Sequence, residues 1–391
     1  MNNPTLLKLY VCFENAYEKS VEIYKYWSTY IQFKGAIRKN VYSKVKLTDK
    51  QKKQIDDFYI KNYGCKIPYI YHQYCTAFTG HFDLHYFPDL VHYPKFEKYM
   101  QHNRAYIKVL SDKNLLPVLT LKAGVKTPQI LLSRVSGVFR DKEGHSVSRQ
   151  EFEKMLSDIG EVFVKPSTGS YGGANCAVID MAKGIDKNSG KTTAQIIKKL
   201  GYNFIVQERL HCHESIAKIY PNSVNTLRII TYQWRGKIYH CPVAMRLGSG
   251  GSTVDNISSG GMFLAVDDDG TLHDTAFNER NIHYTKHPDT KLVFKGYVIP
   301  YVDKMIQAAI RMHEVCAQMG ICYWDFTLDT TGEPVLLEIN LNNGGIRPAQ
   351  MSHGKGLFGE NTAEILRWTA KMKKLSFRER RKYGFGYMEK Q

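Results

Sequence analysis

Two apolar segments near the carboxyl end, ICYWDFTLD and PVLLEIN, predict adjacent strands that carry carboxylates. With residues 330–333 as the connection, Asp325 lies directly opposite Glu338, and the period of two places Asn340 on the same face. Like charges directly opposite each other repel, so the pair requires a cation between them. Two carboxylates and an amide oxygen suit Mg²⁺, as one or two ions, with Mn²⁺ as an alternative. The competing interpretation is a solvent-facing strand edge with acidic residues by chance.

A second signal is a glycine-rich loop at residues 167–173, directly after a short apolar strand that ends at a lysine. Such a loop can present successive backbone N–H groups to phosphate oxygens, while a lysine adds a point charge. An ordinary glycine-rich turn is the alternative, and a solvated lysine is the alternative for the one that lies earlier in the chain. The candidate phosphate-binding residues are Lys113, Lys165, Ser167, Ser170, Gly172 and Gly173.

The segment FIVQERL predicts a strand whose apolar run ends in Gln207 and Glu208. Adenine recognition needs a donor and an acceptor beside an apolar slot, and the end of a strand can supply both. Glu214 follows shortly afterwards and can accept hydrogen bonds from ribose hydroxyls. These three residues are weak evidence when taken alone.

The remaining pattern mixes helices and strands, which predicts an α+β fold with largely antiparallel sheets. A capping box at Thr48 predicts a helix that runs through Lys61. The apolar residues of 302–310 recur at helical spacing and predict a second helix, with Gly320 as its C-cap. Residues 237–247 predict one strand. We expect an N-terminal helical and aromatic region at 1–105, parts of one catalytic unit at 106–206 and 207–370, and a basic tail at 371–391.

The formal net charge of +17 predicts a polyanionic partner. Basic residues gather at 34–53 and 371–382, and Trp368, Leu375 and Phe377 lie among the second group, so a membrane-surface contact competes with a solvated helical face. Nucleic acid is not favoured, because no recognised binding motif is present. The eight cysteines are irregularly spaced, and the sequence has neither an apolar run long enough to cross a membrane nor a secretory pattern. We therefore expect a cytoplasmic location, with the inner membrane surface as an alternative.

Two histidine-containing segments could hold a metal, but a metal is the less favoured interpretation of both. Residues 211–213 cannot easily converge on one ion, and His72, His81, Asp83 and His85 are more simply explained as hydrogen-bonded groups in an aromatic core.

The candidate residues together resemble the ATP-grasp superfamily. The segments that carry this resemblance are KPSTGSYGG, QERL and a strand pair in which Asp325 comes thirteen residues before Glu338. DKNLLPVLTLKAGVKTP, with Lys113, is similar to a segment of D-Ala-D-Ala ligases. NTLRIIT, AMRLGSGGSTVDNISSGG and YWDFTLD are similar to the sugar-transfer-associated ATP-grasp branch, which is linked to cell-surface polysaccharide synthesis. The resemblance spans about residues 106–365.

The resemblance implies two α+β subdomains that clasp ATP and follow a mainly helical N-terminal region. In that arrangement Lys113 and Lys165 hold the phosphates, Gln207 meets the adenine amino group, and the hairpin carboxylates bind magnesium. Many relatives have glutamate or lysine at the position of Gln207, so base selectivity stays open. The backbone at Glu208 and Leu210 completes the base contacts, Glu214 holds the ribose, and Asp325, Glu338 and Asn340 are the metal ligands.

Phosphoryl transfer to a carboxylate brings two anions together, so cations must offset their repulsion. Arg228 and Arg246 are the candidate catalytic residues, because a charge within an apolar strand is costly unless it points into a polar cleft. A structural salt bridge is the alternative for either arginine. The residues expected on the acceptor side and near the phosphates are Asp255, Asn256, Ser258, Gly260, Asn342 and Arg347.

The predicted activity is that of an ADP-forming ligase that activates a carboxylate as an acyl phosphate and joins it to an amine. The resembled branch suggests an amide between an amino acid and a sugar, at a uronic acid or an amino sugar, and the basic surface suits an anionic or lipid-linked saccharide. The alternatives are a peptide ligase for a small metabolite, a kinase that phosphorylates a hydroxyl, and a basic nucleic-acid-binding protein with a degenerate ATP fold.

Overall fold

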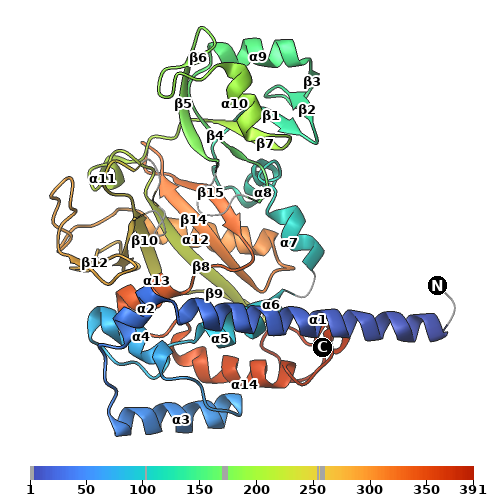
Figure 1. Ribbon diagram of the computed structural model, residues 1–391, viewed down its shortest axis with the longest axis vertical. Helices are drawn as coiled ribbons and strands as arrows, with labels where there is room; N and C mark the ends of the chain where they lie inside the picture. The colour runs from blue at the N-terminus through green and yellow to red at the C-terminus, as the bar shows by residue number, and fades with distance from the viewer. Residues whose placement is uncertain (1–3, 102–103, 170–174, 253–254, 256–259) are drawn as a thin grey trace.

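The computed structural model describes residues 4–101, 104–169, 175–252, 255 and 260–391. Within these residues two antiparallel sheets and their helices form three layers along the long axis (Figure 1). The smaller sheet lies at one end, the larger sheet lies in the middle, and most N-terminal helices lie at the other end. The α+β class predicted from the sequence is confirmed.

The smaller sheet has the strand order β3-β2-β1-β7-β4-β5-β6. Two helices pack against it, α9 (Arg149–Ser157) and α10 (Thr193–Leu200), and each begins with a capping box. The strands are β1 (Ile130–Val135), β2 (Val138–Arg140), β3 (Ser146–Val147), β4 (Gly160–Pro166), β5 (Ala177–Ala182), β6 (Ile185–Asp186) and β7 (Phe204–Glu208).

The larger sheet has the strand order β13-β12-β11-β10-β8-β14-β15, and β9 also pairs with β8. Its strands are β8 (Thr226–Trp234), β9 (Lys237–His240), β10 (Val243–Leu247), β11 (Met262–Val266), β12 (Ala276–Phe277), β13 (His283–Tyr284), β14 (Ile321–Leu328) and β15 (Pro334–Asn340). The predicted single strand over 237–247 is wrong, because Pro242 lacks the N–H that a continuous ladder needs.

Alternation along β8 gives the larger sheet two apolar faces. Leu227 and Ile229 join one core with α8 (Leu116–Ala123) and α12 (Val302–Val315). Ile230 and Tyr232 join the opposite core, which contains the N-terminal and C-terminal helices. Arg228 shares the second face, so the N-terminal region covers the face that carries the candidate catalytic arginine.

The N-terminal region is helical, as predicted. Its long first helix spans the molecule and projects beyond it at the amino end (Figure 1). The predicted capping box at Thr48 is present and opens α3. The elements are α1 (Pro4–Phe33), α2 (Ala36–Tyr42), α3 (Asp49–Tyr63), α4 (Ile70–Thr79), α5 (Asp89–Val91), the π-helix η1 (His92–Phe96), α6 (Glu97–Met100) and α7 (Arg104–Leu110).

The C-terminal segment folds onto this region. Trp368 is fully buried and Leu375 packs against the same core, which contradicts the alternative of a membrane-surface contact through these two residues. No helix among the described residues has the length and apolar character to cross a membrane. The remaining elements are α11 (Glu214–Ala217), α13 (Arg347–His353), the 3₁₀ helix η3 (Gly359–Asn361), α14 (Thr362–Met372) and α15 (Phe377–Arg380).

Gly320 does not cap α12, which ends at Val315. Its backbone N–H donates to the Met100 carbonyl at 2.7 Å, and an added Cβ would meet that oxygen at 2.6 Å. The glycine therefore allows the N-terminal region to approach the larger sheet closely.

Buried histidines make the fold sensitive to acid. Burial lowers the pKa of His72 to about 4, of His92 to about 3 and of His313 to about 4. In the unfolded chain each histidine takes up a proton near pH 6.5, whereas in the folded protein it stays neutral to lower pH. The free energy of unfolding should therefore decrease as the pH is lowered below 6.5, by about 1.4 kcal/mol for each histidine and each pH unit.

Urea unfolding between pH 7 and pH 5 measures this slope. His313→Gln should remove about a third of the three-histidine contribution, and the exposed control His145→Gln should leave the slope unchanged. A pH slope that His313→Gln leaves intact would contradict the assignment.

Candidate functional site

The hairpin of β14 and β15 places Asp325 opposite Glu338, as predicted, although the connection is longer than expected. Near the turn Phe326 pairs with Leu336, and Leu337 is an additional residue that forms a bulge. Without this bulge Leu337 would oppose Asp325, and Glu338 would point to the other face. The connection spans residues 329–333, so the predicted connection 330–333 is wrong and the bulge restores the predicted pairing.

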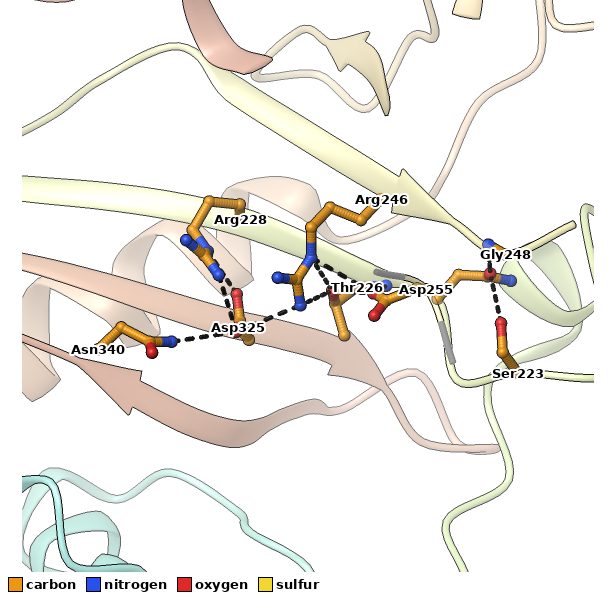
Figure 2. A network of polar contacts seen from close by, with 9 residues as sticks. Ser223, Thr226, Arg228, Arg246, Gly248, Asp255, Asp325 and Asn340 are labelled. Atoms are coloured by element: carbon orange, nitrogen blue, oxygen red, sulfur yellow. Dashed lines mark hydrogen bonds and ion pairs between the residues drawn. The ribbon is translucent and has the colours of Figure 1, made fainter. Parts of the chain in front are cut away.

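Asp325 is buried among cationic and amide donors that converge on its carboxylate (Figure 2). Arg228 donates through Nε at 2.5 Å and Nη2 at 3.1 Å, Nη2 of Arg246 lies 3.2 Å away, and Nδ2 of Asn340 donates at 3.2 Å. Burial raises the pKa of Asp325, but the two arginines outweigh burial and the net pKa is lowered. The carboxylate is therefore ionised at neutral pH.

Arg246 connects this carboxylate to a second one. Its Nε and Nη2 donate to the Thr226 hydroxyl at 3.0 and 2.9 Å, and its Nε lies 3.4 Å from Asp255 (Figure 2). Asp255 also accepts the Thr226 N–H at 3.1 Å and the Thr226 hydroxyl. Burial raises the pKa of Asp255. Asp255 thus holds Arg246, rather than only lining the acceptor side as expected.

Two lysines reach the hairpin, one from the turn between α7 and α8 and one from β4 of the smaller sheet. Nζ of Lys113 lies 3.0 Å from Glu338, and its backbone N–H donates to the Ser167 carbonyl at 3.0 Å. Nζ of Lys165, at the end of β4, donates to the carbonyl of the bulge residue Leu337 at 3.3 Å. Burial lowers the pKa of Lys165 to about 8. The predicted phosphate lysines and metal ligands therefore meet at one place.

A cavity of about 570 Å³ opens beside Glu338 and Asn340. Thr168 and Gly169 of the predicted phosphate loop line it, and so does α1 through Tyr17. Its cationic lining residues are Lys25, Lys98, Arg104, Lys108 and Lys113. The site thus combines a carboxylate hairpin with a cavity that attracts anions.

The nucleotide residues lie along β7 and the segment after it. Gln207 is buried, and its amide nitrogen Nε2 donates to the Pro128 carbonyl at 3.1 Å. Glu208 accepts the Gln129 N–H at 2.8 Å, and Leu210 is half-buried. Glu214 is exposed at the start of α11, where it pairs with Lys218 at 2.9 Å.

The other predicted residues are more dispersed. Asn342 lines the cavity and accepts from Lys25 at 2.9 Å, Arg347 lies 3.6 Å from Asp89, and the Gly260 carbonyl accepts from a serine hydroxyl at 3.1 Å. Ser170, Gly172, Gly173, Asn256 and Ser258 lie outside the described residues.

A family model described as sugar-transfer associated ATP-grasp matches residues 95–365, more than half of the chain. The chain belongs to this family. The resemblance drawn from the sequence is confirmed, and the fold is an ATP-grasp fold with an N-terminal helical region. No curated protein matches the chain in a sequence comparison.

Solved ATP-grasp structures are similar at low identity. L-amino acid ligase from Bacillus licheniformis is 12% identical, with TM-score 0.36, over 67% of this chain and 48% of its own. VanG D-Ala:D-Ser ligase from Enterococcus faecalis is 11% identical, with TM-score 0.39, over 67% and 61%. D-alanyl-alanine synthetase A from Vibrio cholerae is 12% identical, with TM-score 0.38, over 67% and 65%. The chain thus spans about half to two thirds of these relatives' lengths.

Sequence reasoning missed Thr226 and, apart from Lys113, the cavity cations of this ATP-grasp protein. Thr226 lies two residues before Arg228 on the same face of β8, so the strand period was a usable signal. Lys25 carried no comparable signal, because its contacts to Glu97 and Asn342 join distant parts of the chain.

Replacing Arg246 should show that the cluster is a coupled unit. Arg246→Met leaves Asp255 buried without its cation, so we expect the free energy of unfolding to fall by about 3 kcal/mol at pH 7. The loss should shrink toward pH 5, because protonation removes the uncompensated charge on a carboxyl whose pKa is already raised.

Urea unfolding at both pH values measures the effect. Arg149→Met, which breaks an exposed pair with Glu153, should change stability by about 0.5 kcal/mol or less. Equal losses for the two variants would contradict the coupled cluster.

Proposed function

We propose that this protein is an ATP-dependent ligase that activates a carboxylate as an acyl phosphate and joins it to an amine. The observation that carries the proposal is the meeting of Lys113 and Lys165 with Glu338 and Asn340 beside a cation-lined cavity, in a chain of the ATP-grasp family. Lys113 also lines the cavity, together with residues of α1 in the N-terminal region.

The hairpin residues fit a magnesium ion by their donor chemistry. Glu338 is 31% exposed toward the cavity, and Asn340 donates through its nitrogen to Asp325, which leaves its amide oxygen available. Asp325, Glu338 and Asn340 would hold the ion, which supplies positive charge to phosphate oxygens when bound.

The cations of the chain have separate tasks in this proposal. Lys113 and Lys165 hold the triphosphate, and Lys165 gains a partner for a charge that burial disfavours. Arg228 and Arg246 keep Asp325 ionised and in place through fixed bonds. Gln207, the backbone at Glu208 and Leu210, and Glu214 would contact the base and the ribose, with Ser167 and the rest of its loop over the phosphates.

The cavity is suited to the carboxylate substrate. A terminal phosphoryl group passes from ATP to a carboxylate oxygen, giving ADP and an acyl phosphate; the amine then forms the C–N bond and phosphate leaves. Lys25, Arg104 and Lys108 offset the repulsion between the two anions before transfer. With the family's link to sugar transfer, these charges favour an amino acid joined to a uronic acid or an amino sugar.

ADP release should require both a carboxylate and an amine. We expect it to fall about 100-fold or more in Glu338→Gln, which removes a metal-binding charge next to Lys113. Glu333→Gln makes the same change at an exposed position of the same hairpin and should retain activity.

Amino acids can be screened against uronic and amino sugars, with the condensed product detected by mass spectrometry. If ADP is released with a hydroxyl acceptor alone and a stable phosphorylated product forms, the activity is that of a kinase and not of a ligase. Unchanged activity in Glu338→Gln would refute the metal assignment.

We also propose that α1 places the enzyme on an anionic membrane. The carboxylates of Glu14, Glu18 and Glu22 all bind cations or donors of the protein body: Glu14 contacts Arg378 at 2.8 Å, and Glu18 contacts Lys98 at 3.0 Å. The acidic side of the helix is therefore neutralised.

A second side of α1 is apolar and aromatic. Its residues are 52–72% exposed and comprise Leu6, Tyr10, Phe13, Tyr24, Trp27 and Ile31. Lys8 and Lys19 are also exposed on this helix, while its acids face inward. Tyrosine and tryptophan favour the lipid headgroup region, and cations favour anionic lipids. A lipid-linked saccharide would then reach a cavity that α1 itself borders.

Co-sedimentation with vesicles tests this contact. The full chain should bind vesicles that contain phosphatidylglycerol more strongly than neutral phosphatidylcholine vesicles, and the Phe13→Ser, Tyr24→Ser, Trp27→Ser variant should lose binding. Leu121→Ser removes an even more exposed apolar side chain elsewhere and should bind normally. If the unmodified protein is a dimer, the triple variant is a monomer and neither binds vesicles, the face is instead an interface between copies of the chain.

A further inference from the structure

A group of metal-ligating side chains lies outside the hairpin site, at the end of α13 and the end of β11. Asp267 follows β11 directly, His273 comes after the next turn, and His353 is the last residue of α13. One ligand atom from each lies within 4.8 Å of the others. Asp267 and His273 also line a cavity of about 770 Å³.

His353 presents one ring nitrogen as a ready ligand. Its Nε2 lies 2.7 Å from the Val243 carbonyl, which can only accept, so Nε2 carries the proton. Nδ1 therefore holds a lone pair, and it is buried without a hydrogen-bond partner. Metal-binding histidines typically donate their second nitrogen to a backbone carbonyl, which fixes the ring and its tautomer. A buried acceptor without a partner needs an explanation, and a cation supplies one.

The other two side chains complete an open site. Nε2 of His273 lies 3.1 Å from Oδ1 of Asp267, and the rings of His273 and His353 have centroids 4.9 Å apart at 66°. The His273 and Asp267 side chains are 35% and 50% exposed, so an ion could enter from solvent and keep a water ligand.

We propose that Asp267, His273 and His353 bind a divalent transition-metal ion, which by ligand chemistry is Zn²⁺. Two imidazoles and one carboxylate suit zinc, whereas magnesium prefers oxygen ligands. The ion fastens the carboxyl end of α13 to the larger sheet. This zinc site differs from the hairpin site in its ligands, because the hairpin offers only oxygen atoms.

To test the site, the full chain is stripped of metal with EDTA and then titrated with zinc in a calorimeter. Excess Mg²⁺ is kept present so that the oxygen donors of the hairpin do not take up zinc. We expect one zinc ion per chain, and affinity lower by about tenfold or more in His273→Ala and in Asp267→Ala. His283→Ala, a histidine of the same cavity outside the trio, should bind like the unmodified protein.

Thermal unfolding gives a second measurement. Zinc should raise the Tm of the unmodified protein and of His283→Ala, but not that of His273→Ala, because only binding to the folded state stabilises it. His273 is partly exposed, so its variant tests the site even where His353→Ala fails to fold. No zinc binding by the unmodified chain, or the same affinity in His273→Ala, would overturn the proposal.

Discussion

A carboxylate buried in the middle of an apolar sheet can stay ionised only where cations are fixed beside it. Asp325 meets this condition through Arg228 on the neighbouring strand and Arg246 on the strand beyond. Arg246 in turn requires Thr226 and Asp255, so the polar cluster extends across three strands. Because removing any charged member leaves a buried charge uncompensated, the cluster fixes the hairpin, and the hairpin fixes the site.

The bulge at Leu337 connects this cluster to the smaller sheet. It turns Glu338 toward Asp325 and toward Lys113, and its carbonyl accepts the Lys165 ammonium. A single inserted residue therefore both aims a carboxylate and binds the second subdomain. A nucleotide between Lys165 and the hairpin would have to replace that lysine contact.

The sequence predicts features that rest on local patterns and fails where distant segments decide the structure. The capping box at Thr48, the α+β class and the facing of Asp325 and Glu338 follow from local periods and pairing rules. The pairing was predicted through a wrong connection, because the turn length and the bulge offset each other. A period identifies which residues share a face, but not which partner covers that face, so the burial of Trp368 was missed.

The same limit applies to the choice of substrate. The family match begins at residue 95, so the hairpin and both lysines lie within it, whereas α1 lies before it. Yet α1 forms part of the cavity wall through Tyr17, Val21 and Lys25. The nucleotide chemistry can therefore be argued from the family, but the acceptor must be argued from this chain's own N-terminal helix. That helix turns Glu18 toward Lys98 and Arg104 and brings Lys25 into the cavity wall, so the charge of the cavity depends on α1 as well as on the residues within the family match.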